Sequence, residues 1–309
     1  MKKEEFFYES RDGVSRIHAV RYTPDNGEVR GIFQIVHGMA EYVERYEDIA
    51  EYMTDRGFVV TGDDHLGHGK SVPEGGTYGY FCEQDPATVV VRDVHRLKKM
   101  TQELYPGVPY ILLGHSMGSF IARNYICRYG SGINAAVIMG TGMQPKALIG
   151  VSKFLAGFQK TFLGDKHPAK FINGLAFGSY NKRIAKPRTE FDWLSVNEAN
   201  VDKYIDDPLC GRLFTVNGFR TLFELISRLH NRKNLEGVPK DLPIFFVAGA
   251  EDPVGDYGKG VEQARDSLAA VGVKDISLKL YPGDRHEILN EDDRDTVKED
   301  IYNWILEKL

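Results

Sequence analysis

Residues 113–119 of this 309-residue chain read LGHSMGS and follow on from the apolar run YILL at 110–113. They contain the pattern Gly-x-Ser-x-Gly, with Ser116 at its centre. The pattern is typical of a serine held on a sharp turn between a strand and a helix, where its hydroxyl is exposed for chemistry. A structural serine between two glycines gives the same letters, so the assignment depends on partners elsewhere in the chain.

A serine hydroxyl attacks well only when a base takes its proton and a carboxylate orients that base. On folds built around such a turn, the acid and then the histidine follow the serine along the chain, each just beyond a strand. Three histidines follow Ser116, and His286 comes directly after the strand-like run ISLKLYPG at 276–283. His167 and His230 lie in segments that look helical. We therefore expect His286 to be the base.

Two acidic residues, Glu251 and Asp252, directly follow the apolar run PIFFVAGA at 243–250. Pro253 stops a helix there and fixes the turn. Because Asp252 lies on the far side of this turn, next to the proline, we expect it to orient the histidine. Glu251 is the alternative.

Ester chemistry of this kind also needs two backbone N–H donors for the negative charge that develops on the carbonyl oxygen. Met117 follows the serine at the start of the next helix, where the helix dipole favours negative charge. The loop after the strand-like run GIFQIVHG at 31–38 supplies the second donor, and Met39 is the expected residue. Met39 and Met117 thus form the predicted oxyanion hole.

Strand-like runs and helical segments alternate along most of the chain, which predicts a mostly parallel, eight-stranded sheet with helices on both faces. About a hundred residues between 141 and 243 contain no clear strand and look helical. We expect one domain, 1–309, with a helical cap inserted at 143–220. Ser195 and Glu198 have the spacing of a capping box that begins a helix within this cap.

The composition is that of an ordinary globular protein, with 42% hydrophobic and 27% charged residues. A net charge of −5 and the lack of a basic cluster argue against a nucleic-acid partner. The three cysteines are widely spaced and give neither a disulfide framework nor a zinc pattern. Since the N-terminus has no apolar signal core and no apolar run could span a bilayer, we expect a cytoplasmic protein. The oligomeric state is left open.

Histidines cluster at two further places in the sequence. His65 and His68 stand beside Asp63 and Asp64, which suggests either a metal site or a structural turn. The short glycine-rich spacing lacks the usual arrangement of zinc ligands, so a structural turn is expected and no metal. His115 precedes the predicted nucleophile and is expected to pack behind the turn.

Five stretches, in this order, resemble the successive motifs of the monoacylglycerol lipase and lysophospholipase branch of the α/β-hydrolases. The cap stretch FDWLSVNEANVDKYIDDPLCG at 191–211 also resembles the cap of bacterial members. The five stretches are HGMAEYVERY (37–46), DDHLGHGKS (63–71), GHSMGS (114–119), AGAEDPV (248–254) and YPGDRHEILNE (281–291).

The resemblance implies an α/β-hydrolase fold, a carboxylic ester hydrolase activity, and neither a metal nor an organic cofactor. It places the nucleophile at Ser116, the acid at Asp252 and the base at His286, with the oxyanion donors at Met39 and Met117. The implied substrates are small acyl esters, namely monoacylglycerols or lysophospholipids. Thioesters or short esters are an alternative because they need the same machinery. A non-catalytic ligand-binding relative is a further alternative.

The cap contains an aromatic row, Phe154, Phe158 and Phe162, at positions i, i+4 and i+8 of an expected helix. Such a row predicts either a face packed on the core or an acyl-chain pocket or lipid-facing rim. We take the three phenylalanines as candidate substrate-pocket residues. Beside them Lys146, Lys153 and Lys160 form a stripe that suits either a solvated face or transient contact with a lipid surface.

Overall fold

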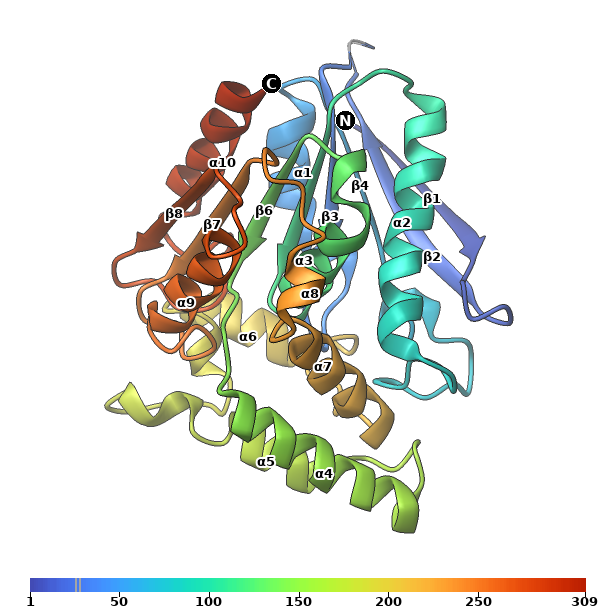
Figure 1. Ribbon diagram of the computed structural model, residues 1–309, viewed down its shortest axis with the longest axis vertical. Helices are drawn as coiled ribbons and strands as arrows, with labels where there is room; N and C mark the ends of the chain where they lie inside the picture. Colours follow the sequence, from blue (N-terminus) through green and yellow to red (C-terminus); the bar gives the residue numbers. More distant parts are fainter. Residues whose placement is uncertain (26, 28) are drawn as a thin grey trace.

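The protein is described by a computed structural model that covers residues 1–25, 27 and 29–309. Its centre is one eight-stranded sheet in the order β1-β2-β4-β3-β5-β6-β7-β8 (Figure 1). The first two strands form an antiparallel hairpin and β2 pairs antiparallel with β4, whereas the other pairs are parallel. The predicted mostly parallel eight-stranded sheet is thus confirmed. The strands are β1 (Lys2–Glu9), β2 (Arg16–Thr23), β3 (Gly31–Val36), β4 (Phe58–Asp63), β5 (Tyr110–His115), β6 (Ala135–Met139), β7 (Ile244–Gly249) and β8 (Ile276–Tyr281).

Helices cover both faces of the sheet, because the central strands are apolar on both sides. Every residue of β3, β4, β5, β6 and β7 is buried. One apolar cluster joins the sheet to two helices, and a larger cluster joins its other face to the remaining ones. The first pair is α1 (Glu47–Thr54) and α10 (Arg294–Lys308), and the second group includes α2 (Pro86–Leu104), α3 (Met117–Tyr129), α8 (Arg232–Leu235) and α9 (Lys259–Ala269).

The helical cap lies between β6 and β7, as predicted, and Figure 1 shows α4 and α5 as a layer apart from the sheet. The expected boundary at residue 220 falls inside α7, which runs on to Arg228. This helix cannot be divided there, because its buried face packs against both α4 of the cap and α3 of the body. The cap helices are α4 (Lys146–Leu163), α5 (Lys170–Phe177), α6 (Glu198–Asp206) and α7 (Val216–Arg228).

The expected capping box does not form at α6. The helix begins at Glu198 with Asn197 as its N-cap, whose side-chain oxygen accepts the amide of Asn200 at 3.1 Å. Ser195 lies outside the helix and donates its hydroxyl to Glu291 at 2.6 Å. Asn and Ser are about equally good N-cap residues, so the serine was free to take a tertiary partner. In the part of the chain that the structure describes, no helix is long and apolar enough to cross a membrane.

Candidate active site

Ser116 occupies a strained turn between β5 and α3, with φ +54° and ψ −120°. The turn fits only because its neighbours lack side chains. A Cβ on Gly118 would overlap the carbonyl oxygens of Val36 and His37, and one on Gly114 would meet the Cβ of Ala122 at 2.6 Å. Such backbone strain persists only where the surrounding structure holds it, and it is found mainly at functional sites.

Asp252 and His286 come together behind this turn. The Nδ1 of His286 lies 2.9 Å from the Oδ2 of Asp252, and the Oδ1 of the aspartate accepts the amide of Val254 at 2.8 Å. Both side chains are buried, whereas the alternative acid, Glu251, is exposed. With Nδ1 engaged by the carboxylate, Nε2 is the ring nitrogen left to exchange a proton.

The two loops that hold this pair touch through their backbones. The amide of Glu251 donates to the carbonyl of Asp284 at 2.9 Å. Gly249 permits the contact, because a Cβ there would collide with the carbonyl oxygens of Asp284 and Arg285. The other histidines after the serine lie elsewhere: His167 is exposed on the cap, and His230 contacts the carbonyl of Gln144 at 2.9 Å.

Met39 and Met117, the expected oxyanion donors, both line the cavity that also exposes Ser116 and His286. Met117 is the first residue of α3, where a helix leaves its amide without an intrahelical acceptor. Met39 follows β3, and the next residue, Ala40, has a positive φ of 56°. This places both methionine backbones at the carboxyl ends of neighbouring parallel strands.

A buried ionic network supports the site, and it went unrecognised in the sequence. Glu41 accepts the amide of Gly38 at 2.6 Å and the hydroxyl of Tyr46 at 2.8 Å. The Nδ1 of His115 lies 3.2 Å from the same carboxylate, and its Nε2 lies 3.2 Å from the carbonyl oxygen of His286. His115 therefore packs behind the turn, where it links Glu41, in the segment after β3, to the backbone of the histidine loop.

Each charged group in this network shifts the pKa of its partner toward the ionised form. Burial alone would raise the pKa of Glu41, but its bond to His115 and the Arg45 charge leave that pKa well below its usual range. Burial likewise opposes the positive form of His115, yet the bond to Glu41 raises its pKa. Arg45 also forms a bidentate ion pair with Glu287, through two hydrogen bonds of 2.8 and 2.9 Å. The sequence signal was the HGMAEYVERY stretch itself, which carries the acid, the tyrosine and the arginine in ten residues.

A cavity of about 1210 Å³ opens above Ser116, between the sheet and the cap. Aliphatic and aromatic side chains of the cap helices form one part of its wall, and polar or charged residues such as Lys170, Arg212 and Lys259 also line it. Pockets for small ligands are usually smaller, so there is room here for a long apolar chain. The apolar residues of α4 and α7 on the wall are Leu148, Ile149, Val151, Leu155, Leu222, Phe223 and Ile226.

The three cap phenylalanines lie outside this cavity, which corrects their assignment as pocket residues. Phe154, Phe158 and Phe162 are 72%, 56% and 69% exposed and point away from the body, so they do not pack on the core either. The helix is apolar on two faces, and the buried Ala156 shows which face meets the rest of the protein. Spacing alone cannot tell these two faces apart.

The lysine stripe is partly paired with acidic residues. Lys153 contacts Glu224 on α7 at 2.7 Å, and Lys160 contacts Asp165 at 2.8 Å. Lys146, at the start of α4, is exposed. The stripe therefore serves partly to fasten α4 to its neighbours.

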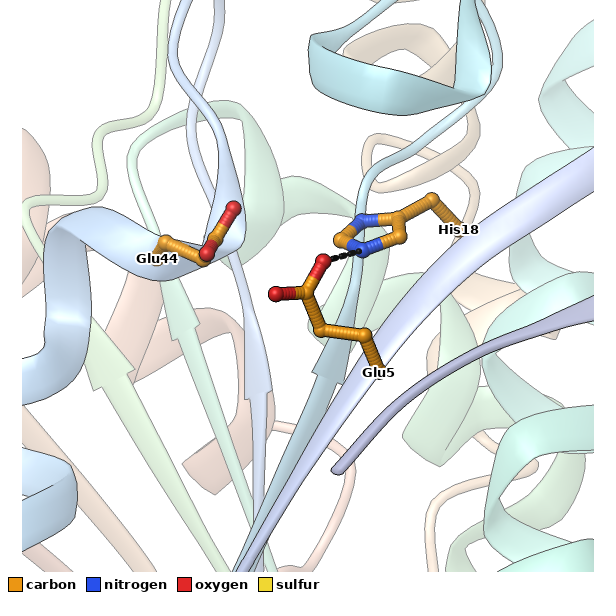
Figure 2. Close-up of side chains that lie close together, drawn as sticks. All are labelled: Glu5, His18 and Glu44. Carbon is orange, nitrogen blue, oxygen red and sulfur yellow. Dashed lines mark hydrogen bonds and ion pairs between the residues drawn. The ribbon is translucent and has the colours of Figure 1, made fainter. Parts of the chain in front are cut away.

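One group of potential metal ligands lies far from the cavity, at the β1–β2 hairpin. The ligand atoms of Glu5, His18 and Glu44 lie within 4.8 Å of one another, and Figure 2 shows His18 hydrogen-bonded to Glu5. Lys70 sits between the two carboxylates, 2.7 Å from Glu5 and 2.8 Å from Glu44, and Lys3 also contacts Glu44. Two lysine charges thus balance these acids, and the group reads as an ionic cluster that ties the hairpin to the loop before α1.

The histidines after β4 are part of the loop framework. The ring of His65 stacks on that of His37 at 4.0 Å, and the Nε2 of His37 accepts the amide of His65 at 3.0 Å. His68 packs edge-on against Phe81 and Phe214. Burial lowers the pKa of His68 to about 3, which keeps it neutral.

Comparisons with known proteins identify the family of the chain. The family model described as "Serine aminopeptidase, S33" matches residues 27–293. A monoacylglycerol lipase of Mycolicibacterium smegmatis is 30% identical over 96% of this chain and 95% of its own length. The monoglyceride lipase of Rattus norvegicus is 28% identical over 94% of this chain and 86% of its own.

The solved structures give the same relationship. A thermostable carboxyl esterase from Bacillus coagulans, solved with glycerol, superposes with a TM-score of 0.90 at 35% identity, covering 100% of this chain and 99% of its own. A soluble variant of monoglyceride lipase from Saccharomyces cerevisiae shares the fold, with a TM-score of 0.78 at 22% identity over 100% of this chain and 95% of its own. The chain belongs to the serine aminopeptidase S33 family of α/β-hydrolases and is a carboxylic ester hydrolase of the monoglyceride lipase group.

Proposed function

We propose that Ser116, His286 and Asp252 form a catalytic triad that hydrolyses acyl esters, with the amides of Met39 and Met117 as the oxyanion hole. The observation that carries the proposal is the hydrogen bond between His286 and Asp252, at 2.9 Å, in a cavity that also exposes the serine on its strained turn. A merely structural serine needs neither partner. The order of the three residues along the chain is the order expected for this fold.

In the proposed reaction His286 Nε2 takes the proton of Ser116 as its oxygen attacks the ester carbonyl. Asp252 orients the ring and balances the charge of the imidazolium, while the two amides stabilise the oxyanion. Collapse of the intermediate breaks the ester bond, and the alcohol leaves with the proton from His286. A water molecule, deprotonated by the same histidine, then attacks the acyl-serine, and the carboxylic acid is released.

Monoacylglycerols or lysophospholipids are the proposed substrates. The size and apolar wall of the cavity suit one long acyl chain, and the side chains proposed to contact it are those of α4 and α7 named above. The names of the similar lipases point to glycerol esters first. Thioesters and short esters remain the competing substrates, because the triad treats all of them alike.

We further propose that the outer face of the cap contacts lipid surfaces during catalysis. Exposed apolar side chains gather on α4 and α5, and large apolar patches on a protein surface mark binding sites. Such contact would bring the cavity to substrates that are themselves dissolved in a lipid layer. The patch consists of the exposed apolar residues outside the cavity, namely Phe154, Phe158, Phe162, Leu163 and Phe171.

A substrate panel tests the triad and the substrate class together. Wild type and Ser116→Ala are compared on monoacylglycerols of several chain lengths, lysophospholipids, short p-nitrophenyl esters and acyl-thioesters. We expect the variant to lose activity on every substrate by about 10⁴-fold or more while it unfolds at the wild-type temperature. Retained hydrolysis in the variant contradicts the triad. Preference for thioesters or short esters contradicts the substrate class and leaves the triad standing.

A further inference from the structure

Trp193 belongs to the cap in sequence but stands against the proposed base. It lies in the short helical turn η5 (Asp192–Leu194), and its ring centroid is 5.2 Å from that of His286, at an angle of 44°. On its other side the indole packs parallel to Phe177, 6.1 Å away, and edge-on to Tyr180, 4.9 Å away. The indole is therefore held between α5 and the imidazole, at the cavity wall.

One buried carboxylate joins the residues after Trp193 to the residue before His286. Glu291 is 0% exposed, although the two acidic residues that follow it, Asp292 and Asp293, are exposed. A carboxylate without solvent needs donors, and Glu291 accepts from four. The donors are the hydroxyl of Ser195 at 2.6 Å and the amides of Val196 at 3.0 Å, Asn197 at 3.2 Å and Arg285 at 2.9 Å.

The two neighbours of His286 also bind the segment around Trp193. The guanidinium of Arg285 donates to the carbonyl oxygens of Asp192 and Ser195, at 2.7 and 3.0 Å. The amide of Glu287 donates to the carbonyl of Leu194 at 2.7 Å. The residues on both sides of the histidine, Arg285 through its side chain and Glu287 through its amide, are thus bonded to the backbone on both sides of the indole. The spacing of the two rings is fixed by these bonds and not by ring contact alone.

The chemistry of the site gives this contact a purpose. His286 must become an imidazolium each time it takes the serine proton, and a cation within about 6 Å of an indole ring is stabilised by it when water is excluded. The indole also restricts rotation of the imidazole away from Asp252. His286 also contacts the imidazole of His115, with ring centroids 4.8 Å apart, but that ring offers no indole face to a cation.

We propose that Trp193 is a positioning residue for His286, held in place by Glu291 and Arg285, so that this part of the cap is a fixed component of the catalytic apparatus. The proposal rests on the triad proposed above. It divides the cap into two parts: residues 191–200, bonded to the histidine loop, and helices α4 and α5, which carry the exposed apolar patch. The first part positions His286, and the second contacts the lipid that contains the substrate.

The test replaces Trp193 and separates kcat from KM on a short water-soluble p-nitrophenyl ester. We expect Trp193→Leu to lower kcat about tenfold or more and to change KM less than about twofold, because the lost interaction acts on the charged histidine. Trp193→Phe keeps an aromatic face and is expected to retain kcat within about threefold of wild type. Reaction with a small fluorophosphonate, which needs the serine and its base but no acyl pocket, is expected to slow in parallel with kcat.

Trp304→Leu is the matched control, because Trp304 is the other tryptophan of the chain, stacks on Phe245 at 5.1 Å and does not line the cavity. It is expected to leave kcat on the short ester within about twofold of wild type. Ser195→Ala removes one of the four donors to Glu291 and is expected to lower kcat about threefold without unfolding the protein, which keeps the test decisive where Trp193→Leu unfolds.

An unchanged kcat in Trp193→Leu, or a change confined to KM for long acyl chains, overturns the proposal and leaves Trp193 as a cavity wall. Failure of the triad itself is recognised separately, because Ser116→Ala would then retain activity. An inactive Ser116→Ala together with a fully active Trp193→Leu therefore rejects this inference alone.

Discussion

A methyl group at residue 118 would occupy the space of two carbonyl oxygens, those of Val36 and His37. These carbonyls lie at the end of β3 and at the start of the loop that carries Met39, so they cannot yield without moving the proposed oxyanion hole. We expect Gly118→Ala to reduce the free energy of unfolding by about 1–3 kcal/mol or more, as overpacking does. Chemical denaturation measures the change, and hydrolysis of a short ester measures the accompanying loss of activity.

Gly150→Ala is the control for this prediction. Gly150 lies within α4, and a Cβ there has no heavy atom within 4 Å. Alanine favours the helix over glycine, so this variant should gain about 0.5–1 kcal/mol. If both variants lost stability equally, the close approach of the Val36 and His37 carbonyls would not explain why residue 118 is glycine.

Residues of the proposed triad could be located from the sequence because each follows a recognisable strand, and the fold fixes where strands end. The long-range bonds of the supporting network could not be predicted, because the two partners of each bond lie far apart along the chain. Arg45 and Glu287 are 242 positions apart, and nothing local to either residue indicates the other. The same holds for Ser195 and Glu291, 96 positions apart, where the local pattern favoured a helix cap.

At the scale of elements, the strands of the sheet could be predicted because the buried strands are uniformly apolar. The cap helices could be predicted from the spacing of their apolar residues. Which side of α4 faces the protein interior could not be predicted from the sequence. Its outer row of phenylalanines repeats every four residues, and so do Leu148, Ser152 and Ala156 toward the interior. Two rows of the same period carry no information about which one is inside. That choice is made by the complementary face of α7.

The β1–β2 hairpin is fastened to α2 by one buried acid, which gives the stability a predictable pH dependence. Asp93 accepts the hydroxyl of Ser10 at 2.7 Å and the amide of Arg11 at 2.6 Å. Burial nevertheless dominates and raises its pKa to about 7. Between the unfolded pKa of about 4 and the folded value, the folded protein binds the extra proton, so stability falls as pH rises through this window.

We expect Asp93→Asn to flatten the fall in unfolding temperature between pH 4.5 and pH 7.5, because the amide keeps an acceptor oxygen and has no charge to bury. Asp12→Asn is the matched control: Asp12 lies in the hairpin turn, partly exposed, and its hydrogen bonds to Ser15 hold its pKa below the usual range despite burial. Its substitution should not remove the slope. A slope that persists in Asp93→Asn would assign the pH dependence to other groups.

At the scale of the whole molecule, charge is distributed unevenly. The chain carries a net charge of −5, yet residues 143–190 contain nine Lys or Arg against two Asp or Glu. All nine basic side chains are exposed, and four of them, Lys146, Lys153, Lys160 and Lys170, lie on the helices that carry the apolar patch. A basic apolar face on an acidic protein favours one orientation against an anionic lipid surface, in which the cap meets the lipid and the acidic body faces water.

Replacing Phe154, Phe158 and Phe162 together by serine tests this orientation. We expect binding to vesicles of phosphatidylcholine with 30% phosphatidylglycerol to weaken about 100-fold, because three aromatic side chains no longer enter the interface. Activity on a monomeric short ester should stay near wild type, since these residues lie outside the cavity.

Phe7→Ser, at an exposed phenylalanine on β1, should leave binding unchanged. Wild-type binding should also weaken with added salt. Equal vesicle binding by the triple variant and wild type would remove the cap from lipid contact, and an equal loss on the monomeric ester would mean that α4 had been distorted instead.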